Sequence, residues 1–524
     1  MSKSKKPQPK GTPDRITRTD ISYTHFGGKA FPTDMYYVGV ANKIYPIIRK
    51  YLKENSHFPA ATSKQMAIVL TCYVEDLVAE TGVWQAFMSL YRKTYGNSRP
   101  FIDPHEETSS LPYDDREPSF HAVLFLIWYV ANNYTPGTLL NPNNPGFQML
   151  ALRLMPDLLE AFDLAPDTPS RPQLTRDLPE GTPLFFLVRE LCEWLSNRCY
   201  LTRIIDREQV NEDIDELLDM TMAKMGEMDP SARDYARNMF VVINAKIGPL
   251  AIPSYRWLAE IVRISHLPDE AEFLPILDAI EVRPYQMYRY EKISKSEATL
   301  KDLNGERLTL SPETMPFGEF MPQIVAGDSA MESLVYFNGV WLLNGFGVQS
   351  LPHKAFDNWR RAFDERKQQQ RHTFEHLLKA FGKRRIGVCR SYDEFAHLAF
   401  GDKELPMRDS DPGLIDHIRE AGNLVYFLNE DGNITLLPGV ATIIKIKDNP
   451  FYDPEQAVRG ISLILDHSYT TPEMRAYLID HRLLPDAALN SALSPDSGRR
   501  LFQQDIRFLN DYTSRDTLPP VAAR

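Results

Sequence analysis

The chain has 524 residues, of which 43% are hydrophobic and 25% are charged, as in an ordinary globular protein. This length predicts about two to four domains at roughly 100–200 residues each. The net charge of −11 excludes a general attraction to nucleic acid phosphate.

The N-terminal segment is basic and rich in proline, and no apolar segment follows it. Residues 1–20 read "MSKSKKPQPKGTPDRITRTD", which predicts a disordered tail and not a secretory signal. The strongest apolar run, "AVLFLIWYVA" at 122–131, is much shorter than the roughly 18–20 residues that a membrane helix needs. We therefore expect a buried helix over 120–133 and no membrane association.

The four cysteines form no C-x-x-C pair, so the usual spacing of a structural zinc site is missing. So few cysteines in a long chain predict reduced thiols in the core and a cytoplasmic location. We expect no cofactor. The residues are Cys72, Cys192, Cys199 and Cys389.

Helical periodicity dominates the first half of the chain. Apolar residues recur at three- and four-residue spacing, which predicts an N-terminal helical domain over 21–164. Residues 165–183 contain five prolines and are expected to form a linker. A second helical region is predicted over 184–283, with helix continuing from 233 to 264.

The period changes near Tyr285 to the alternation typical of strands. Asn304-Gly305 and Asn338-Gly339 each lie between two short strand patterns and predict β-hairpins. Together they predict a small β-module over 284–350.

The remaining region, 351–524, is expected to be mainly helical. It begins with a helix over 353–381, closed by Gly382, and contains a third hairpin over about 423–438 that turns at Asp431-Gly432. The predicted fold class is α+β, mainly α-helical.

Two stretches resemble an uncharacterised family of proteins from gut bacteria of the Bacteroides kind. They are "FPTDMYYVGVANKIYPII" near the N-terminus and "NPFYDPEQAVRGISLILDHSYTTPEMRAYLIDHRLLPDAALNSAL" with "GRRLFQQDIRFLNDY" near the C-terminus. The shared residues are of the packing type, so the resemblance implies a common fold over most of the chain and no activity.

The β-module also resembles the small β-barrel that accompanies SEC-C zinc motifs in many bacterial proteins. The similar residues are "KISKSEATLKDLNGERLTL" and "LVYFNGVWLLNGFG". This resemblance implies a small β-barrel-like module. Because the cysteine-rich zinc motif is absent from this sequence, the resemblance implies no metal site here.

One pattern is typical of the inverted zinc peptidases, the H-x-x-E-H of His372, Glu375 and His376. Two imidazoles one helical turn apart can bind zinc, and Glu375 would be the general base. Glu430 or Glu455 would supply a third ligand.

The helical period places this pattern on the face opposite Phe374 and Leu377, beside Lys379 and other polar residues. A solvated face near lysines is a poor place for a catalytic dication. We therefore favour an ordinary polar helix face and predict no metal and no catalytic residue.

Two surfaces could bind a partner. Residues 359–385 hold nine Lys or Arg and only three Asp or Glu, and they end at Arg384 and Arg385. These cations could meet an acidic partner, although a solvated helix would carry them as well. Tyr336 and Trp341 on the second hairpin could stack on a ligand, although such aromatic residues commonly fill a barrel core.

The sequence thus favours an uncharacterised cytoplasmic protein with a non-catalytic binding or scaffold role, and with a protein partner or self-association. The alternatives are a zinc-dependent hydrolase that uses His372, Glu375 and His376, and a nucleic-acid-associated accessory protein, which the net charge does not favour.

Overall fold

The structure is a computed structural model of the chain. It describes residues 15–55, 58–102, 115–135, 139–168, 181–222, 230–265, 273–314, 325–347, 351, 353–401, 412–466, 469–485 and 495–518. The predicted tail lies mostly outside these residues, although α1 begins at Arg18, within the predicted range. Most of the predicted proline-rich linker also lies outside them.

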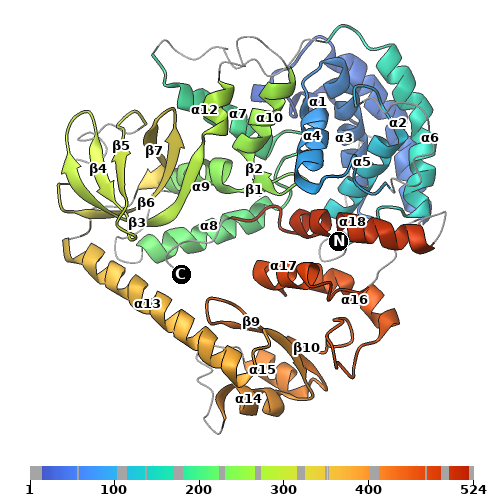
Figure 1. Ribbon diagram of the computed structural model, residues 1–524. Helices are drawn as coiled ribbons and strands as arrows, with labels where there is room; N and C mark the ends of the chain where they lie inside the picture. Colours follow the sequence, from blue (N-terminus) through green and yellow to red (C-terminus); the bar gives the residue numbers. More distant parts are fainter. Residues whose placement is uncertain are drawn as a thin grey trace, which may run out of the picture.

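A helical body forms from the first half of the chain (Figure 1). Its helices pack around one large hydrophobic core. They are α1 (Arg18–Ser22), η1 (Phe26–Gly28), α2 (Asp34–Asn55), α3 (Ala60–Val78), α4 (Val83–Tyr95), α5 (Phe120–Asn133), α6 (Pro145–Asp163), α7 (Leu184–Asn197), α8 (Arg207–Met222), α9 (Pro230–Asn244), α10 (Ser254–Ser265) and α12 (Leu274–Asp278).

Helix α5 is the centre of this body, as the apolar run predicts. The Ser119 side chain caps it by accepting a hydrogen bond from the Ala122 backbone at 3.2 Å. Every residue from Ala122 to Asn132 is buried, so the predicted buried helix is confirmed. Among the described helices, none has the length and apolar character needed to cross a bilayer.

The prediction that helix continues from 233 to 264 is wrong in the middle of this range. Helix α9 ends at Asn244, and a short hairpin of β1 (Lys246–Ile247) and β2 (Ile252–Pro253) follows. Gly248, with a φ of +67°, turns the chain there against Trp257 and Thr202, where a helix cannot continue. Helical periodicity on both sides of the turn concealed it.

The β-module is a closed barrel of five strands in the order β3-β4-β5-β7-β6. Both hairpin predictions are confirmed, because β4 pairs with β5 and β6 pairs with β7, each antiparallel. The strands are β3 (Glu281–Ile293), β4 (Ala298–Lys301), β5 (Arg307–Leu310), β6 (Ser329–Phe337) and β7 (Val340–Gly347).

Strand β6 joins the barrel to the helical body because both of its faces are buried. Ala330 and Leu334 belong to the barrel core, whereas Val335 and Phe337 belong to the core of the helical body. The Phe337 ring lies 5.3 Å from the Phe185 ring of α7. The barrel is therefore packed firmly against the helices.

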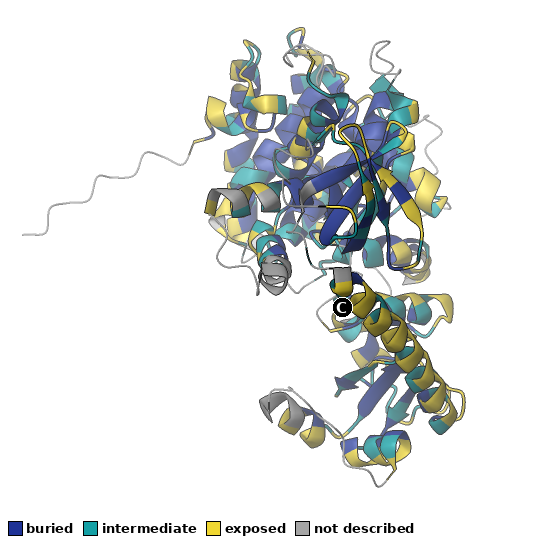
Figure 2. Cartoon of the chain, turned by 90° about the vertical axis from the view of Figure 1, so that its left-hand side faces the viewer, coloured by how far each residue is buried: buried dark blue, intermediate teal, exposed yellow. Residues whose placement is uncertain are grey.

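Helix α13 (His353–Ala380) leads from the barrel to a smaller lobe (Figure 1). At its start Asp357 forms an ion pair with Arg289 of the barrel at 2.6 Å. Most residues in the middle of this helix are exposed to solvent (Figure 2). It ends as predicted, since Gly382 adopts a φ of +61° and its N–H donates to the Lys379 carbonyl at 3.1 Å.

The smaller lobe contains the third predicted hairpin, β9 (Leu424–Leu428) and β10 (Ile434–Pro438). A third strand, β8 (Ile386–Cys389), pairs antiparallel with β9 and was not predicted. Helices α14 (Tyr392–Phe400) and α15 (Pro412–Glu420) complete the lobe.

All four cysteines of the chain are buried and free of disulfides, and burial raises the pKa of the Cys192 thiol to about 12.

The β9–β10 turn lies directly against α13. Gly432 has a φ of +81°, and a Cβ added there would lie 2.9 Å from the Gln370 carbonyl oxygen and 3.2 Å from the Thr373 Cβ. We expect Gly432→Ala to lower the free energy of unfolding by about 2–3 kcal/mol, because alanine resists this φ and meets backbone there. Urea unfolding followed by circular dichroism measures the loss.

Gly439→Ala is the matched control, because Gly439 also has a positive φ, +74°, but no atom lies within 4 Å of an added Cβ. It should cost only the backbone term of about 1 kcal/mol. Equal losses in both variants would show that the turn does not pack on α13.

The chain finally returns to the helical body through α16 (Pro454–Leu465), α17 (Pro472–Asp480) and α18 (Pro495–Thr513) (Figure 1). Phe508 of α18 is fully buried against the rings of Tyr91 in α4 and Phe125 in α5. The two ends of the chain therefore share one core.

Candidate functional site

A polar cavity of about 550 Å³ opens on the helical body where several helices converge. Its wall contains three arginines, two tyrosines and three side-chain amides. Tyr23 follows α1, Gln65 lies on α3, Tyr134 follows α5, Asn197 ends α7 and Asn238 lies on α9. We call this cavity the arginine pocket.

The three arginines of the pocket come from one short segment between α7 and α8. Arg198 follows the last residue of α7, Arg203 lies in the connecting loop, and Arg207 begins α8. The far end of the chain supports the loop, because Asp516 accepts hydrogen bonds from the backbone N–H groups of residues 205 and 206, at 3.1 and 3.2 Å.

Neutral oxygen atoms hold two of the guanidinium groups in place. Arg207 donates through Nη1 to Asn197 Oδ1 at 2.9 Å and through Nη2 to Asn238 Oδ1 at 2.6 Å. Arg203 donates through Nη2 to Gln65 Oε1 at 2.7 Å. These contacts orient the two side chains without forming an ion pair with either of them.

The third guanidinium, of Arg198, lies over the Tyr23 ring, with its Cζ 5.3 Å from the ring centroid. The Tyr23 hydroxyl donates to the Asn197 carbonyl at 3.3 Å. A cation–π contact of this kind also positions a charge without neutralising it.

No carboxylate of the described residues forms an ion pair with Arg198, Arg203 or Arg207. Burial lowers the pKa of the Arg207 guanidinium, and the nearby Glu193 opposes this change. Half-buried cations normally have paired charges. The pocket therefore presents an excess of positive charge to whatever enters it.

The sequence contains a faint signal for this pocket that our predictions missed. Three arginines occur within ten residues, "RCYLTRIIDR" at 198–207, beside only one acidic residue. The spacing matches no known motif, and the amides that orient them come from distant parts of the chain.

The H-x-x-E-H residues lie on the open face of α13, as the helical period predicts. His372, Glu375 and His376 are exposed, and Glu375 forms an ion pair with Arg371 at 3.0 Å. No third ligand of the described residues gathers with them.

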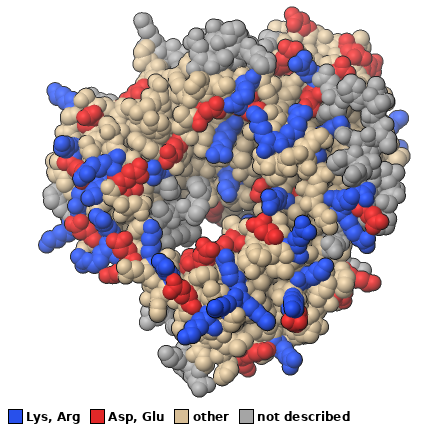
Figure 3. Space-filling view, viewed as in Figure 1, with Lys and Arg blue, Asp and Glu red and all other residues tan. Residues whose placement is uncertain are grey.

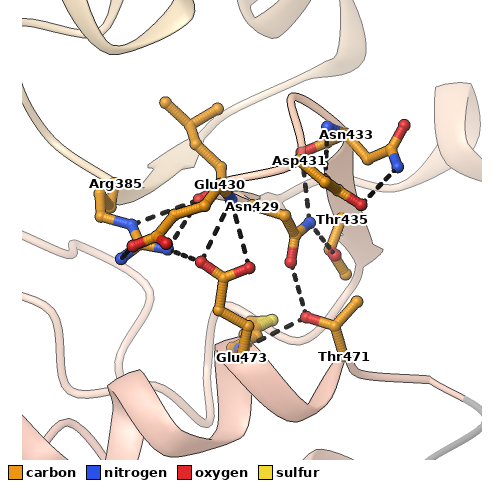
Figure 4. Close-up of polar contacts among 10 residues, drawn as sticks. Arg385, Asn429, Glu430, Asp431, Asn433, Thr435, Thr471 and Glu473 are labelled. Atoms are coloured by element: carbon orange, nitrogen blue, oxygen red, sulfur yellow. Dashed lines mark hydrogen bonds and ion pairs between the residues drawn. The ribbon is translucent and has the colours of Figure 1, made fainter. Parts of the chain in front are cut away.

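Arg385 lies just before β8, beside Glu430 and Glu473 (Figure 4), and its side chain is 21% exposed. It forms an ion pair with Glu430 of the β9–β10 turn at 3.3 Å and another with Glu473 in the first turn of α17. Arg385 therefore ties the smaller lobe to α17. Its neighbour Arg384 is exposed.

Tyr336 and Trp341 lie together in the barrel, with ring centroids 5.3 Å apart. Trp341 is 8% exposed and belongs to the barrel core, whereas Tyr336 is half-buried beside it. Arg283 covers the Trp341 ring at 5.3 Å. Their predicted role in binding stays a prediction.

Comparison with known proteins places the chain in a family. Residues 22–282 and 339–515 match the family described as "Protein of unknown function (DUF3843)". Neither the curated proteins nor the solved structures give a significant match. The unmatched interval, 283–338, contains most of the barrel, whereas the whole arginine pocket lies within the match. Because the match extends over most of its length, the chain belongs to this family of unknown function, DUF3843.

Proposed function

We propose that the chain is a non-catalytic binding protein that holds a small oxyanion ligand, carrying phosphate or carboxylate groups, in the arginine pocket. The observation that carries the proposal is the set of three arginines oriented only by neutral amides and a tyrosine ring. An anion would add negative charge to that of Glu193, the single carboxylate among the lining residues.

The chemistry of the pocket suits such a ligand. Each guanidinium has five N–H donors in a planar fork, and the internal contacts use only some of them. The remaining donors match the oxygens of phosphate or carboxylate in pairs. A cavity of about 550 Å³ also lies within the usual range for small-molecule sites.

The same wall supports a binding role over a catalytic one. Its described residues include no histidine, cysteine, serine or lysine, so it offers no usual nucleophile with its base. Glu193, at the exposed rim, is the single carboxylate. It would select ligands that carry a hydrogen-bond donor beside the anionic group.

We expect oxyanions to stabilise the purified full chain against heat. Inorganic phosphate, pyrophosphate, adenosine monophosphate and citrate are the probes, each with chloride at equal ionic strength as the reference. A ligand present at 100 times its Kd adds about 2.7 kcal/mol to the free energy of unfolding. Isothermal titration calorimetry then gives the affinity and separates phosphates from carboxylates.

Arg203→Gln and Arg207→Gln should each weaken binding of the best probe by about 10- to 100-fold, because each removes a charge-assisted contact. Arg371→Gln, which makes the same change at a side chain that is 83% exposed on α13, is the control. The proposal fails if no probe binds, or if the pocket variants bind as tightly as the control.

For the partner protein we propose the exposed face of α13 together with Arg384, which follows the helix. The helix is exposed through its middle, and its cations outnumber its acidic residues. Acidic side chains are mixed among the basic ones on this side of the molecule (Figure 3), which suits a protein partner better than a nucleic acid backbone.

From the four unbridged thiols we also infer a cytoplasmic location.

A further inference from the structure

Three metal-ligating side chains meet in the interior of the helical body, apart from the arginine pocket. His25 precedes η1, Asp34 is the first residue of α2, and Glu75 lies on α3. They are 2%, 0% and 4% exposed. One potential ligand atom of each lies within 4.8 Å of the others.

The hydrogen bonds of His25 indicate its tautomer. Nδ1 lies 2.8 Å from the Lys29 carbonyl oxygen, which can only accept, so Nδ1 carries a proton. In neutral imidazole the lone pair is then on Nε2, which lies 3.3 Å from Glu75 Oε2. A carboxylate and this lone pair repel each other unless a proton or a metal ion lies between them.

The same arrangement is typical of histidines that bind metals. Such a histidine usually donates its second ring N–H to a backbone carbonyl or a carboxylate, which fixes the ring and its tautomer. Here the turn at Gly27 and Gly28, both with φ of +65°, brings the Lys29 carbonyl back to His25.

Asp34 supplies an independent sign of a missing ligand. Its Oδ2 accepts from the Phe31 backbone N–H at 2.9 Å and from Arg18 Nε at 3.4 Å. Its Oδ1 is buried and has no hydrogen-bond partner among the described residues. This oxygen faces the His25 ring and lies 3.8 Å from Nδ1. A buried carboxylate oxygen without a partner is costly.

The charges lead to the same conclusion. Two buried carboxylates, of Asp34 and Glu75, face the imidazole of His25, and Arg18, whose side chain is 48% exposed, contacts Asp34. A divalent cation would pair with both carboxylates and with the lone pair on Nε2.

We propose that His25, Asp34 and Glu75 bind a divalent transition-metal ion that joins the turn after α1 to α2 and α3. One imidazole and two carboxylates form a nitrogen and oxygen ligand set, which suits zinc and, with a larger share of oxygen, manganese. Because the cluster is closed to solvent, the ion has a structural role and needs no open position for substrate.

The first test is the metal content of the untagged full chain, measured by elemental mass spectrometry after removal of bound metal and dialysis against zinc or manganese. We expect close to one ion per chain. The chelator should also lower the melting temperature of the reloaded wild-type protein, a measurement that requires no variant.

Asp34→Asn and Glu75→Gln keep the size of each side chain, and asparagine can still accept from the Phe31 N–H. Both variants should lose the metal and the effect of the chelator, while circular dichroism shows that they fold. His376→Ala, in the exposed H-x-x-E-H pattern, should keep the metal.

Two results would overturn the proposal. One is a wild-type protein that takes up neither zinc nor manganese, which would mean that a proton on His25 neutralises the cluster. The other is a metal that survives Asp34→Asn and Glu75→Gln but is lost in His376→Ala, which would place it on α13.

Discussion

Phe508→Ala is expected to lower the free energy of unfolding of the helical body by about 3–5 kcal/mol. Phe508 is fully buried on α18. Its ring centroid lies 5.3 Å from that of Tyr91, 5.6 Å from that of Phe101 and 6.5 Å from that of Trp128. Alanine would leave a cavity where the last helix meets α4 and α5, so the loss of burial and the loss of aromatic contacts add.

Tryptophan fluorescence during urea unfolding reports this change directly, because Trp84 and Trp128 lie in the same aromatic cluster. Tyr469→Ala removes a ring that is 58% exposed and should change the free energy by less than about 0.5 kcal/mol. A loss below about 1 kcal/mol in Phe508→Ala would show that α18 contributes little to this core.

Local patterns predicted the elements whose cause is itself local. The asparagine–glycine and aspartate–glycine turns, the apolar run of α5 and the glycine that ends α13 each determine their structure within a few residues. Strand β8 has only four residues and exists because β9 pairs with it. Helix α18 lies in the region that was predicted to be mainly helical, but its packing partners lie about 400 positions earlier in the chain and could not be predicted.

The two candidate sites depend even more on contacts between distant residues. Arg203 and Gln65, which meet in the pocket, are 138 positions apart, and His25 and Glu75 are 50 positions apart. No periodicity links such pairs, so the sequence could not predict either site. The H-x-x-E-H pattern was visible because it is local, and for the same reason it carried little information about a cavity.

Raising the pH from about 5 to about 7 is expected to reduce the stability of the wild-type protein relative to Asp505→Asn by about 2 kcal/mol. Asp505 of α18 is fully buried, and its Oδ2 accepts from the Phe101 backbone N–H at 2.9 Å. Burial raises its pKa from 3.8 to about 7, although the Tyr91 hydroxyl and this N–H favour the charged form.

The direction follows from proton binding. Between about pH 4 and pH 7 the folded protein keeps a proton on Asp505 that the unfolded chain has released, so the free energy of unfolding falls as the pH rises. Each pH unit in this interval costs about 1.4 kcal/mol. Asparagine cannot titrate, and its amide can still accept from Phe101 and contact Tyr91, so the variant escapes this loss.

Urea unfolding at pH values from about 5 to about 8, with both proteins in the same buffers, measures the difference and cancels the titration of all other groups. Tyr91→Phe supplies a second check. It removes a donor that stabilises the charged carboxylate, so the interval of falling stability should extend to higher pH. A difference between wild type and Asp505→Asn that stays constant with pH would mean that Asp505 is already ionised in the folded protein. Its negative charge would then be stabilised inside the core by hydrogen bonds, among them those from the Tyr91 hydroxyl and the Phe101 N–H.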